Sequence, residues 1–340
     1  TKVNTTTAGV QRFPAIAMDN SENFTIVWCE IASGGTQSIK GQRYNSSGTA
    51  QGSEFTVNSS SAGFQGYPDI AMDRSSGDFA VVWQSSDLDG SGMGVYAQRY
   101  NSSATAQGSE FKVNSTTSGH QREPRIAMDQ SGNFAVVWSS YNQDGSSYGV
   151  YAQRYNSSGT AQGSEFKVNE TTSGAQIYPA IAMSAEGSFA IVWTGFDSDS
   201  KAQPYISGYK SDGTLIASDT LITSADNFQL TPDIAIYNEN RGLAFSYQQG
   251  LKWGSAGDGD DFGIYAISDG GGDILYDALT FVSSSPVAGT YSADTSANLT
   301  FTFDTDVKSS TLTSSNIIVR GSYTGKISGS LSGGGSKTVT

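Results

Sequence analysis

Residues 124–138 read PRIAMDQSGNFAVVW, a sequence that predicts two short strands joined by a tight turn. Proline has no backbone N–H, which suits the start of a strand, and Ser-Gly-Asn has turn chemistry. The segment from Phe134 to Trp138 is β-branched and aromatic on both faces, which predicts a fully buried strand. Two further strands are expected at 148–155 and 165–168, so residues 124–168 form a four-stranded unit.

The pattern of this unit recurs along the chain with a period of about 55 residues. The tryptophan that ends the second strand returns every 55 residues, at Trp28, Trp83, Trp138 and Trp193. The proline of the first strand occurs five times, at Pro14, Pro68, Pro124, Pro179 and Pro232. The fifth unit is degenerate, with strands expected at 231–236, 243–247, 262–267 and 278–282. Such internal repetition is the signature of a repeat architecture.

Four short antiparallel strands per unit are what a β-propeller blade requires, and ring closure protects the sheet edges. A β-solenoid has much shorter rungs, and separate β-sandwiches need about 100 residues each. The sequence therefore predicts an all-β protein with a five-bladed β-propeller-like repeat domain over residues 1–283. Residues 2–4 match the end of a fourth strand, and they would either close the ring against the fifth unit or pair with another molecule.

The repeat carries Gly-Val-Tyr-Ala-Gln-Arg-Tyr-Asn in its third strand and Glu-Phe-x-Val-Asn in its fourth. It resembles repeats of very large secreted and surface proteins of prokaryotes. Further on, NLTFTFD at 298–304 and SNIIV at 315–319 resemble a bacterial Ig-like domain of the S-layer type. Such domains run to about 100 residues, so residues 284–340 predict a partial Ig-like β-sandwich that is either truncated or completed by another chain.

The composition excludes several classes of partner. The formal net charge is −13, with 19 scattered Lys and Arg residues, so the phosphate backbone of a nucleic acid would be repelled. No run of about 18 apolar residues exists, so we expect no transmembrane segment. The lone Cys29 cannot form an internal disulfide, and other residues take its place in the other units, so it reads as a strand residue.

Nine Asn-x-Ser/Thr motifs suggest a secreted glycoprotein. Together with the family resemblance, they predict an extracellular or cell-surface location. Because Asn-Ser-Ser also makes good turns, a purely structural role for these asparagines stays open. The candidate glycosylation sites are Asn4, Asn23, Asn45, Asn58, Asn101, Asn114, Asn156, Asn169 and Asn298.

An enzyme needs a constellation of reactive side chains, and the supply here is thin. The chain has one histidine, His120, and one cysteine. This scarcity argues against a Ser-His-Asp triad and against a zinc site with several histidine ligands. The carboxylates mostly recur from unit to unit, as in Glu54, Glu110 and Glu165, whereas a catalytic pair should occur once. Arginines that repeat at one strand position are expected to brace neighbouring blades. The sequence therefore predicts a protein that is not an enzyme.

The loops between the second and third strands are rich in acidic residues. Oxygen ligands at alternate positions of a glycine-containing loop can surround a hard cation such as calcium. No bidentate glutamate follows at the EF-hand distance, so the alternative is a solvated turn. The candidate metal ligands, for which calcium is the possible cofactor, are Asp87, Asp89, Asn142, Asp144, Asp197, Asp199, Asp258, Asp260 and Asp261.

A glutamine precedes each proline by three residues. In a propeller these glutamines would lie on the same face as the acidic loops, with aromatic residues such as Tyr67 and Tyr178 nearby, and this face could bind a sugar or another surface ligand. The alternative is that each glutamine caps local backbone groups. The candidate ligand-face residues are Gln11, Gln65, Gln121, Gln176 and Gln229.

These features favour a non-enzymatic structural or adhesive component of a prokaryotic cell surface or extracellular filament. Its expected partners are copies of itself and other surface proteins, because an incomplete sandwich leaves an open sheet edge for strand addition, and glycans are a further expected partner. The alternative is a lectin-like propeller that binds carbohydrate. A glycan-active enzyme is the third interpretation.

Overall fold

The computed structural model describes residues 2–222 apart from Asp87, Asp89 and 197–200, and beyond residue 222 it describes strand segments up to Val339. Every regular element in these residues is a strand. Four consecutive sheets each contain four antiparallel strands in chain order, which confirms the predicted all-β repeat. In the described part of the chain, no helix is long and apolar enough to cross a membrane.

The bounds of the strands follow the repeat. The first sheet contains β1 (Val10–Met18), β2 (Phe24–Ile31), β3 (Gln37–Tyr44) and β4 (Ala50–Thr56). The second contains β5 (Gln65–Met72), β6 (Phe79–Ser86), β7 (Met93–Tyr100) and β8 (Phe111–Lys112). The third contains β9 (Gln121–Met128), β10 (Phe134–Tyr141), β11 (Tyr148–Tyr155) and β12 (Phe166–Lys167). The fourth contains β13 (Gln176–Met183), β14 (Phe189–Phe196), β15 (Ala202–Tyr209) and β16 (Leu215–Leu221).

A fifth sheet contains β17 (Phe228–Tyr237), β18 (Gly242–Gly250) and β19 (Gly263–Ser268). Its expected fourth strand, at 278–282, overlaps β20 (Phe281–Ser285), which instead pairs with β21 (Thr300–Val307). That sheet is completed by β24 (Ser336–Val339), and a two-stranded sheet contains β22 (Arg320–Gly321) and β23 (Gly325–Lys326). These described segments do not by themselves make a sandwich, so the Ig-like domain and the boundary at residue 283 stay predictions.

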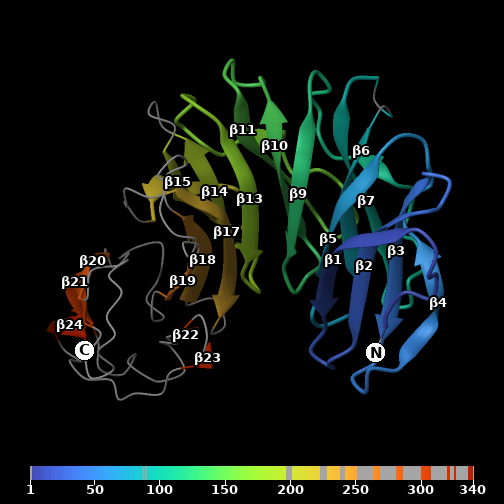
Figure 1. Ribbon diagram of the computed structural model, residues 1–340, viewed down its shortest axis with the longest axis horizontal. Helices are drawn as coiled ribbons and strands as arrows, with labels where there is room; N and C mark the ends of the chain where they lie inside the picture. The colour runs from blue at the N-terminus through green and yellow to red at the C-terminus, as the bar shows by residue number, and fades with distance from the viewer. Residues whose placement is uncertain are drawn as a thin grey trace.

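The sheets follow one another along an arc, as blade-like units (Figure 1). The first strand of each sheet contacts the first strand of the next, from β1 to β5, β9, β13 and β17. From β5 onward, each of these strands also packs across the second and third strands of the preceding sheet. The arrangement resembles the blades of a propeller, with the first strands toward the inner side of the arc.

The apolar core lies between neighbouring sheets rather than within one. Each cluster of buried residues draws one set of side chains from a sheet and the facing set from the next. The four repeat tryptophans are at most 3% exposed, which confirms that they are buried at equivalent positions. Cys29 is likewise a buried residue of its strand, as expected from the sequence.

The first strands begin earlier than predicted. They start three or four residues before the repeat proline, so the proline lies inside the strand and not at its start. The register shifts there, for example between Gly66 and Asp69, and this β-bulge removes the proline from the hydrogen-bond ladder. The residue before the proline takes a positive φ in all five units, at Phe13, Tyr67, Glu123, Tyr178 and Thr231.

Candidate functional site

The repeat glutamines form hydrogen bonds to the backbone of their own turns. Gln65, Gln121 and Gln176 are at most 2% exposed, and each donates from Nε2 to the carbonyl oxygen three residues before it, at 2.8–3.0 Å. Their prediction as ligand-face residues is therefore wrong, because a polar group buried this deeply is used in satisfying the turn. Gln11 makes the same bond to Ala8 at 3.1 Å, and the side chain of Gln229 lies outside the described residues.

Three of the candidate glycosylation sites are also buried. Asn58, Asn114 and Asn169 are at most 6% exposed. In each, Oδ1 accepts a bond from a third-strand N–H at 2.6–2.7 Å, and Nδ2 donates to the carbonyl oxygen two residues later. Because a glycan would need that Nδ2, these three predictions are wrong.

Three of the other asparagine motifs lie on turns. Oδ1 of Asn45, Asn101 and Asn156 accepts bonds from the N–H groups two and four residues later, which is the structural role left open above. Asn23 is exposed, and Asn298 lies outside the described residues. Glycosylation at Asn4, Asn23, Asn45, Asn101, Asn156 and Asn298 stays a prediction.

Neighbouring sheets are joined by a repeated set of contacts, which we call the intersheet latch. A carboxylate on the fourth strand or its approach accepts a bond from the backbone just after the buried asparagine of the preceding sheet. Glu110 does so for Ser59 and Glu165 for Ser115, both at 2.6 Å. The recurring carboxylates therefore have a structural role, as their repetition indicated.

Two further side chains extend this latch. The hydroxyl of Tyr100 donates to the carbonyl oxygen of Val57 at 3.3 Å, and Tyr155 makes the same bond to Val113. Arg154 donates to the Ser211 carbonyl oxygen of the next sheet at 2.6 Å, so the predicted bracing of neighbouring sheets by repeat arginines is confirmed at this position.

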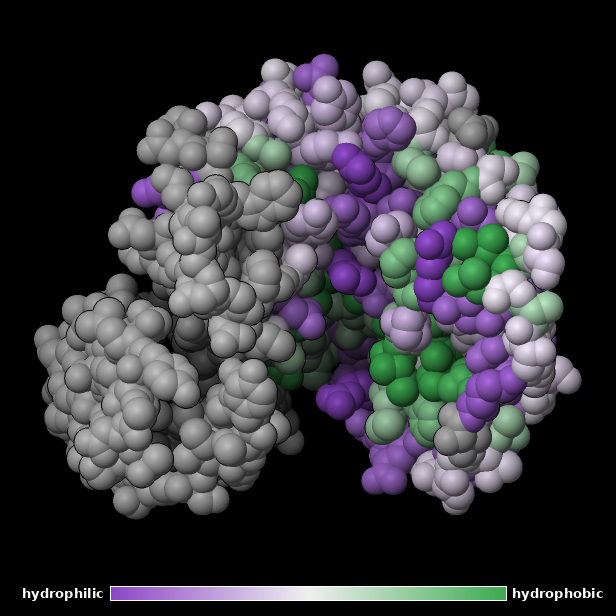
Figure 2. All heavy atoms as spheres, viewed as in Figure 1, coloured by the Kyte–Doolittle hydropathy of each residue, from purple (hydrophilic) through white to green (hydrophobic). Residues whose placement is uncertain are grey.

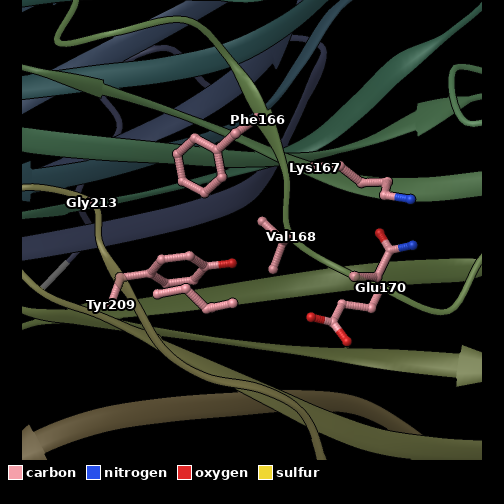
Figure 3. Close-up of a pocket in the computed structure, with 8 residues that line it drawn as sticks. Phe166, Lys167, Val168, Glu170, Tyr209 and Gly213 are labelled. Carbon is pink, nitrogen blue, oxygen red and sulfur yellow. The ribbon is translucent and has the colours of Figure 1, made fainter.

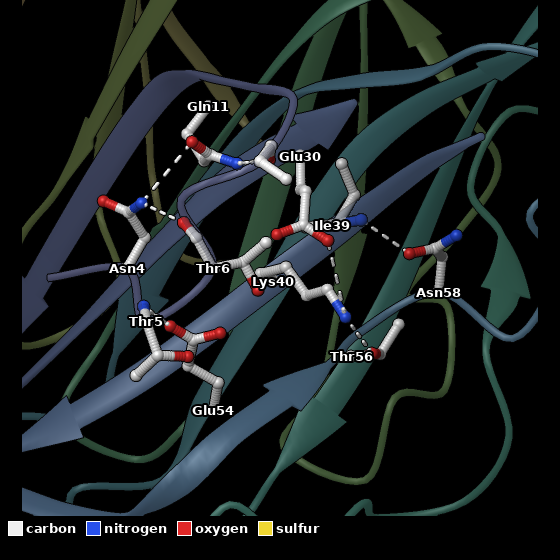
Figure 4. A network of polar contacts seen from close by, with 11 residues as sticks. Asn4, Thr5, Thr6, Gln11, Glu30, Ile39, Lys40, Glu54, Thr56 and Asn58 are labelled. Atoms are coloured by element: carbon white, nitrogen blue, oxygen red, sulfur yellow. Dashed lines mark hydrogen bonds and ion pairs between the residues drawn. The ribbon is translucent and has the colours of Figure 1, made fainter. Parts of the chain in front are cut away.

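Residues 2–5 are bound to the first sheet as the end of a preceding fourth strand would be (Figure 4). The N–H of Thr5 donates to Glu54, and the hydroxyl of Tyr44 lies 3.5 Å from the carbonyl oxygen of Val3. Nδ2 of Asn4 donates to the carbonyl oxygen of Thr6 and to Gln11 Oε1, and Asn114 and Asn169 make the same pair of bonds. Asn4 Oδ1, however, has no third-strand partner among the bonds of the described residues.

The face of the first sheet that points away from the second sheet is uncovered. Ile16 is 58% exposed and Met18 is 46% exposed, whereas their equivalents Ile70 and Met72 are buried at 5% and 8%. Hydrophobic residues gather on this sheet in the space-filling view (Figure 2). The N–H of Trp28 beneath this face is buried without a hydrogen-bond partner. We call this surface the open face.

Two of the predicted metal ligands can be placed. Asn142 and Asp144 lie in the loop between β10 and β11, where Asp144 Oδ1 accepts a bond from Ser146 at 3.1 Å. The other seven lie outside the described residues, and among the described ones no three His, Cys, Asp or Glu side chains converge. Calcium therefore stays a prediction.

A different set of polar residues surrounds the inner strand prolines. At these positions the repeat varies, and the first strands bring together two tyrosines, two acids and two arginines, which we call the inner-strand cluster: Tyr67, Asp69, Arg122, Glu123, Arg125 and Tyr178. The sequence analysis did not select the acids and arginines, because it ranked positions by recurrence. The sequence does contain a signal for them. These residues differ from unit to unit, although the proline beside them recurs in every unit.

Hydrogen bonds hold both acids of the cluster, from the next sheet for the carboxyl of Asp69 and from its own sheet for the carboxyl of Glu123. Asp69 Oδ2 accepts a bond from the N–H of Ile126 at 3.0 Å, so the second sheet's acid is held by the third sheet. Glu123 receives a bond from Ser139 Oγ at 3.3 Å, and its own N–H donates to Gln84 Oε1 at 2.9 Å. These contacts place the carboxyls along the line where the inner strands meet.

The surroundings of these acids disfavour their charged forms. Burial raises the pKa of Glu123, although Arg122 and a backbone bond from Tyr178 oppose the shift. Burial likewise raises the pKa of Asp69 against the opposing effect of Arg125. Two inner-strand acids with raised pKa values are the type of group found at binding and catalytic sites, and also in structural ion-pair networks.

The raised pKa of Asp69 predicts a pH dependence of stability. Because the folded protein holds this proton more tightly than the unfolded chain does, the stability falls as pH rises from the unfolded-state pKa, about 4, through the folded-state pKa. We expect Asp69→Asn to flatten this fall, since the amide oxygen can still accept the Ile126 bond. Thermal unfolding midpoints from pH 4 to pH 8 would measure it, and parallel curves for the two proteins would contradict the expectation.

A separate pocket of about 480 Å³ lies between the end of the third sheet and the fourth sheet (Figure 3). Its walls include Phe166, Val168 and Tyr209, with Lys167 and Glu170 at its margin. The tilted ring contact of Phe166 on Tyr209 at 5.4 Å recurs at the other sheet junctions, where Phe111 meets Tyr155 at 5.3 Å. This recurrence indicates a packing feature of the repeat.

No protein-family model matches the chain, and no curated protein sequence matches it significantly. Among solved structures, an α-L-arabinanase from Penicillium chrysogenum complexed with arabinobiose is similar, with a TM-score of 0.49 and 11% identity over 74% of this chain and 80% of that one. An endo-arabinase from Bacteroides thetaiotaomicron (TM-score 0.43, 14% identity, 75% and 93% covered) and an α-L-arabinofuranosidase from Lactobacillus brevis (0.44, 10%, 82% and 92%) are also similar. These likenesses are weak, and no property of this chain rests on them.

Proposed function

We propose that this protein is a non-enzymatic structural subunit of a prokaryotic cell-surface or extracellular assembly, in which its five sheets are propeller blades and copies join through their terminal sheets. The single observation that carries the proposal is the incomplete intersheet latch at residues 2–5. There the contacts with Glu54 and Tyr44 are present, but among the bonds of the described residues Asn4 Oδ1 accepts none from a third-strand N–H. The adhesive role, the partial Ig-like domain and calcium binding are further parts of the same proposal.

The partner that we propose for this latch is a sheet whose third strand has a free edge. The fifth sheet ends in β19, and no fourth strand pairs with β19 among the described residues. Tyr265 pairs with Tyr247 as Tyr96 pairs with Trp83, so Ile264 occupies the position of Val95. The N–H of Ile264 would then donate to Asn4 Oδ1, as the N–H of Val95 does to Asn114.

The partner sheet is proposed to belong to a second copy. Residues 2–5 lie on the first sheet, at the opposite end of the arc from β19 (Figure 1), so the two segments do not meet in this arrangement. Docking would cover Ile16 and Met18, and complete burial of such a side chain contributes about 1.5–3 kcal/mol before the cost of association. Because the two surfaces that join are different, the contact repeats head to tail and gives a filament unless it closes into a ring.

Light scattering on the 340-residue chain tests this proposal. We expect the mean mass to rise with protein concentration, and we expect Ile16→Asp combined with Met18→Asp to abolish that rise. Leu215→Asp is the matched control, because Leu215 is also exposed, at 45%, but lies on the outer strand of the fourth sheet. A wild-type chain that stays monomeric at high concentration, with or without closure onto its own β19, would exclude the proposal.

A further inference from the structure

The inner strands present one backbone geometry with different side chains. In each of the five units the residue before the proline has φ between 50° and 58°, a region that residues with a side chain rarely adopt. Such a conformation persists only where the surroundings impose it, and it concentrates at binding and catalytic sites. Here the bulge is part of every repeat, so the fold supplies the geometry and the sequence is free to change the side chain.

Two of these residues expose aromatic rings. Tyr67 is 41% exposed and Tyr178 is 38% exposed, although both belong to inner strands whose other apolar residues are mostly buried. Phe13 stacks on Tyr67 with ring centroids 4.1 Å apart and planes 22° apart, which fixes the orientation of the Tyr67 ring. A tyrosine combines an apolar ring face with a polar tip, and a fixed ring loses little entropy when a ligand stacks on it.

The charges within the cluster balance. Arg122 and Arg125 offset the formal charges of Asp69 and Glu123, and Asp233 of β17, whose charge also acts on Asp69, adds one negative charge beside them. Arg122 is itself held over the ring of Tyr148, with 4.2 Å from its guanidinium carbon to the ring centroid. Guanidinium donors and carboxyl acceptors side by side can bind hydroxyl groups, which both donate and accept. A phosphate or a carboxylate would find no excess of positive charge here.

We propose that the inner-strand cluster is a binding site for a neutral saccharide. The tyrosine rings would stack on the C–H faces of the sugar, while Asp69, Glu123 and Arg125 would bind its hydroxyl groups. Hydrophilic residues line the inner, hollowed side of the arc in the space-filling view (Figure 2). The site uses different residues from the open face, so it is independent of the proposed assembly.

Saturation-transfer NMR with a panel of neutral pentose and hexose di- and trisaccharides would identify a ligand, and calorimetry would give its Kd. We expect Tyr178→Ala to weaken binding by at least about tenfold, whereas Leu215→Ala should leave it unchanged. Arg125→Ala is a second variant at an exposed side chain, in case the tyrosine variant does not fold, and it should also weaken binding. The proposal would be overturned if no neutral saccharide binds the wild-type protein, or if both Tyr178→Ala and Arg125→Ala bind with unchanged affinity.

Discussion

Replacing Trp138 with alanine is expected to lower the free energy of unfolding by about 3–5 kcal/mol. The side chain is 0% exposed and packs in the cluster between the second and third sheets, beside Val82 and Val95. Its indole N–H has no hydrogen-bond partner, unlike that of Trp83, so the expected loss comes from packing alone. The cavity would lie at a sheet junction, and strands on both sides of it would lose contacts.

Urea denaturation followed by circular dichroism would measure this loss. Tyr141→Ala is the matched control, because Tyr141 belongs to the same strand, β10, but is 45% exposed. We expect its effect to stay within about 1 kcal/mol. Equal losses for the two variants would show that the intersheet core does not carry the stability of the repeat.

The second large effect is expected at the latch asparagine. Asn114→Ala should cost about 2–4 kcal/mol, because it leaves the N–H of Val95 and the carbonyl oxygen of Thr116 without their partners in a buried region. The same substitution removes the hydrogen bond that Asn114 Nδ2 donates to Oε1 of Gln121, the first residue of β9. One side chain therefore connects the second sheet to the strand that opens the third.

Asn101→Ala provides the comparison for this variant. Asn101 belongs to the same repeat and the same sequence motif, but its oxygen serves only its own turn, through Ser103 and Thr105. We expect a loss of about 1 kcal/mol or less. Hydrogen exchange would add a local measurement, since the amide of Val95 should lose protection in Asn114→Ala and keep it in Asn101→Ala. If Val95 keeps full protection in both variants, the latch does not act as described.

The repeat itself was predictable because it depends on local chemistry. Alternating turn residues and β-branched runs, spaced by 55 residues, define the strands, and their tryptophans are buried as expected. The strand starts were misplaced because the sequence cannot show a bulge. A proline reads as a strand boundary unless the preceding residue takes a positive φ, as Tyr67 does, and lets the strand continue through it.

The candidate sites could be predicted only in part. Recurrence correctly assigned Glu110, Glu165 and Arg154 to structural bonds between sheets. It also suggested surface roles for Gln121 and Asn114, which the structure places in the same buried network. A polar residue that recurs in every unit has the same sequence signature whether it faces solvent or satisfies a buried backbone group.

The sequence by itself determined the order of the strands and the repetition of the unit, since both depend on residue type and spacing along the chain. Only the tertiary structure decided which faces are covered and which residues meet. The exposure of Ile16 and the joining of Asp69 to Ile126 both depend on which sheet packs against which. Contacts between sheets join residues about 40 to 60 positions apart, and a pattern that recurs from unit to unit carries no information about where the series of sheets is left uncovered.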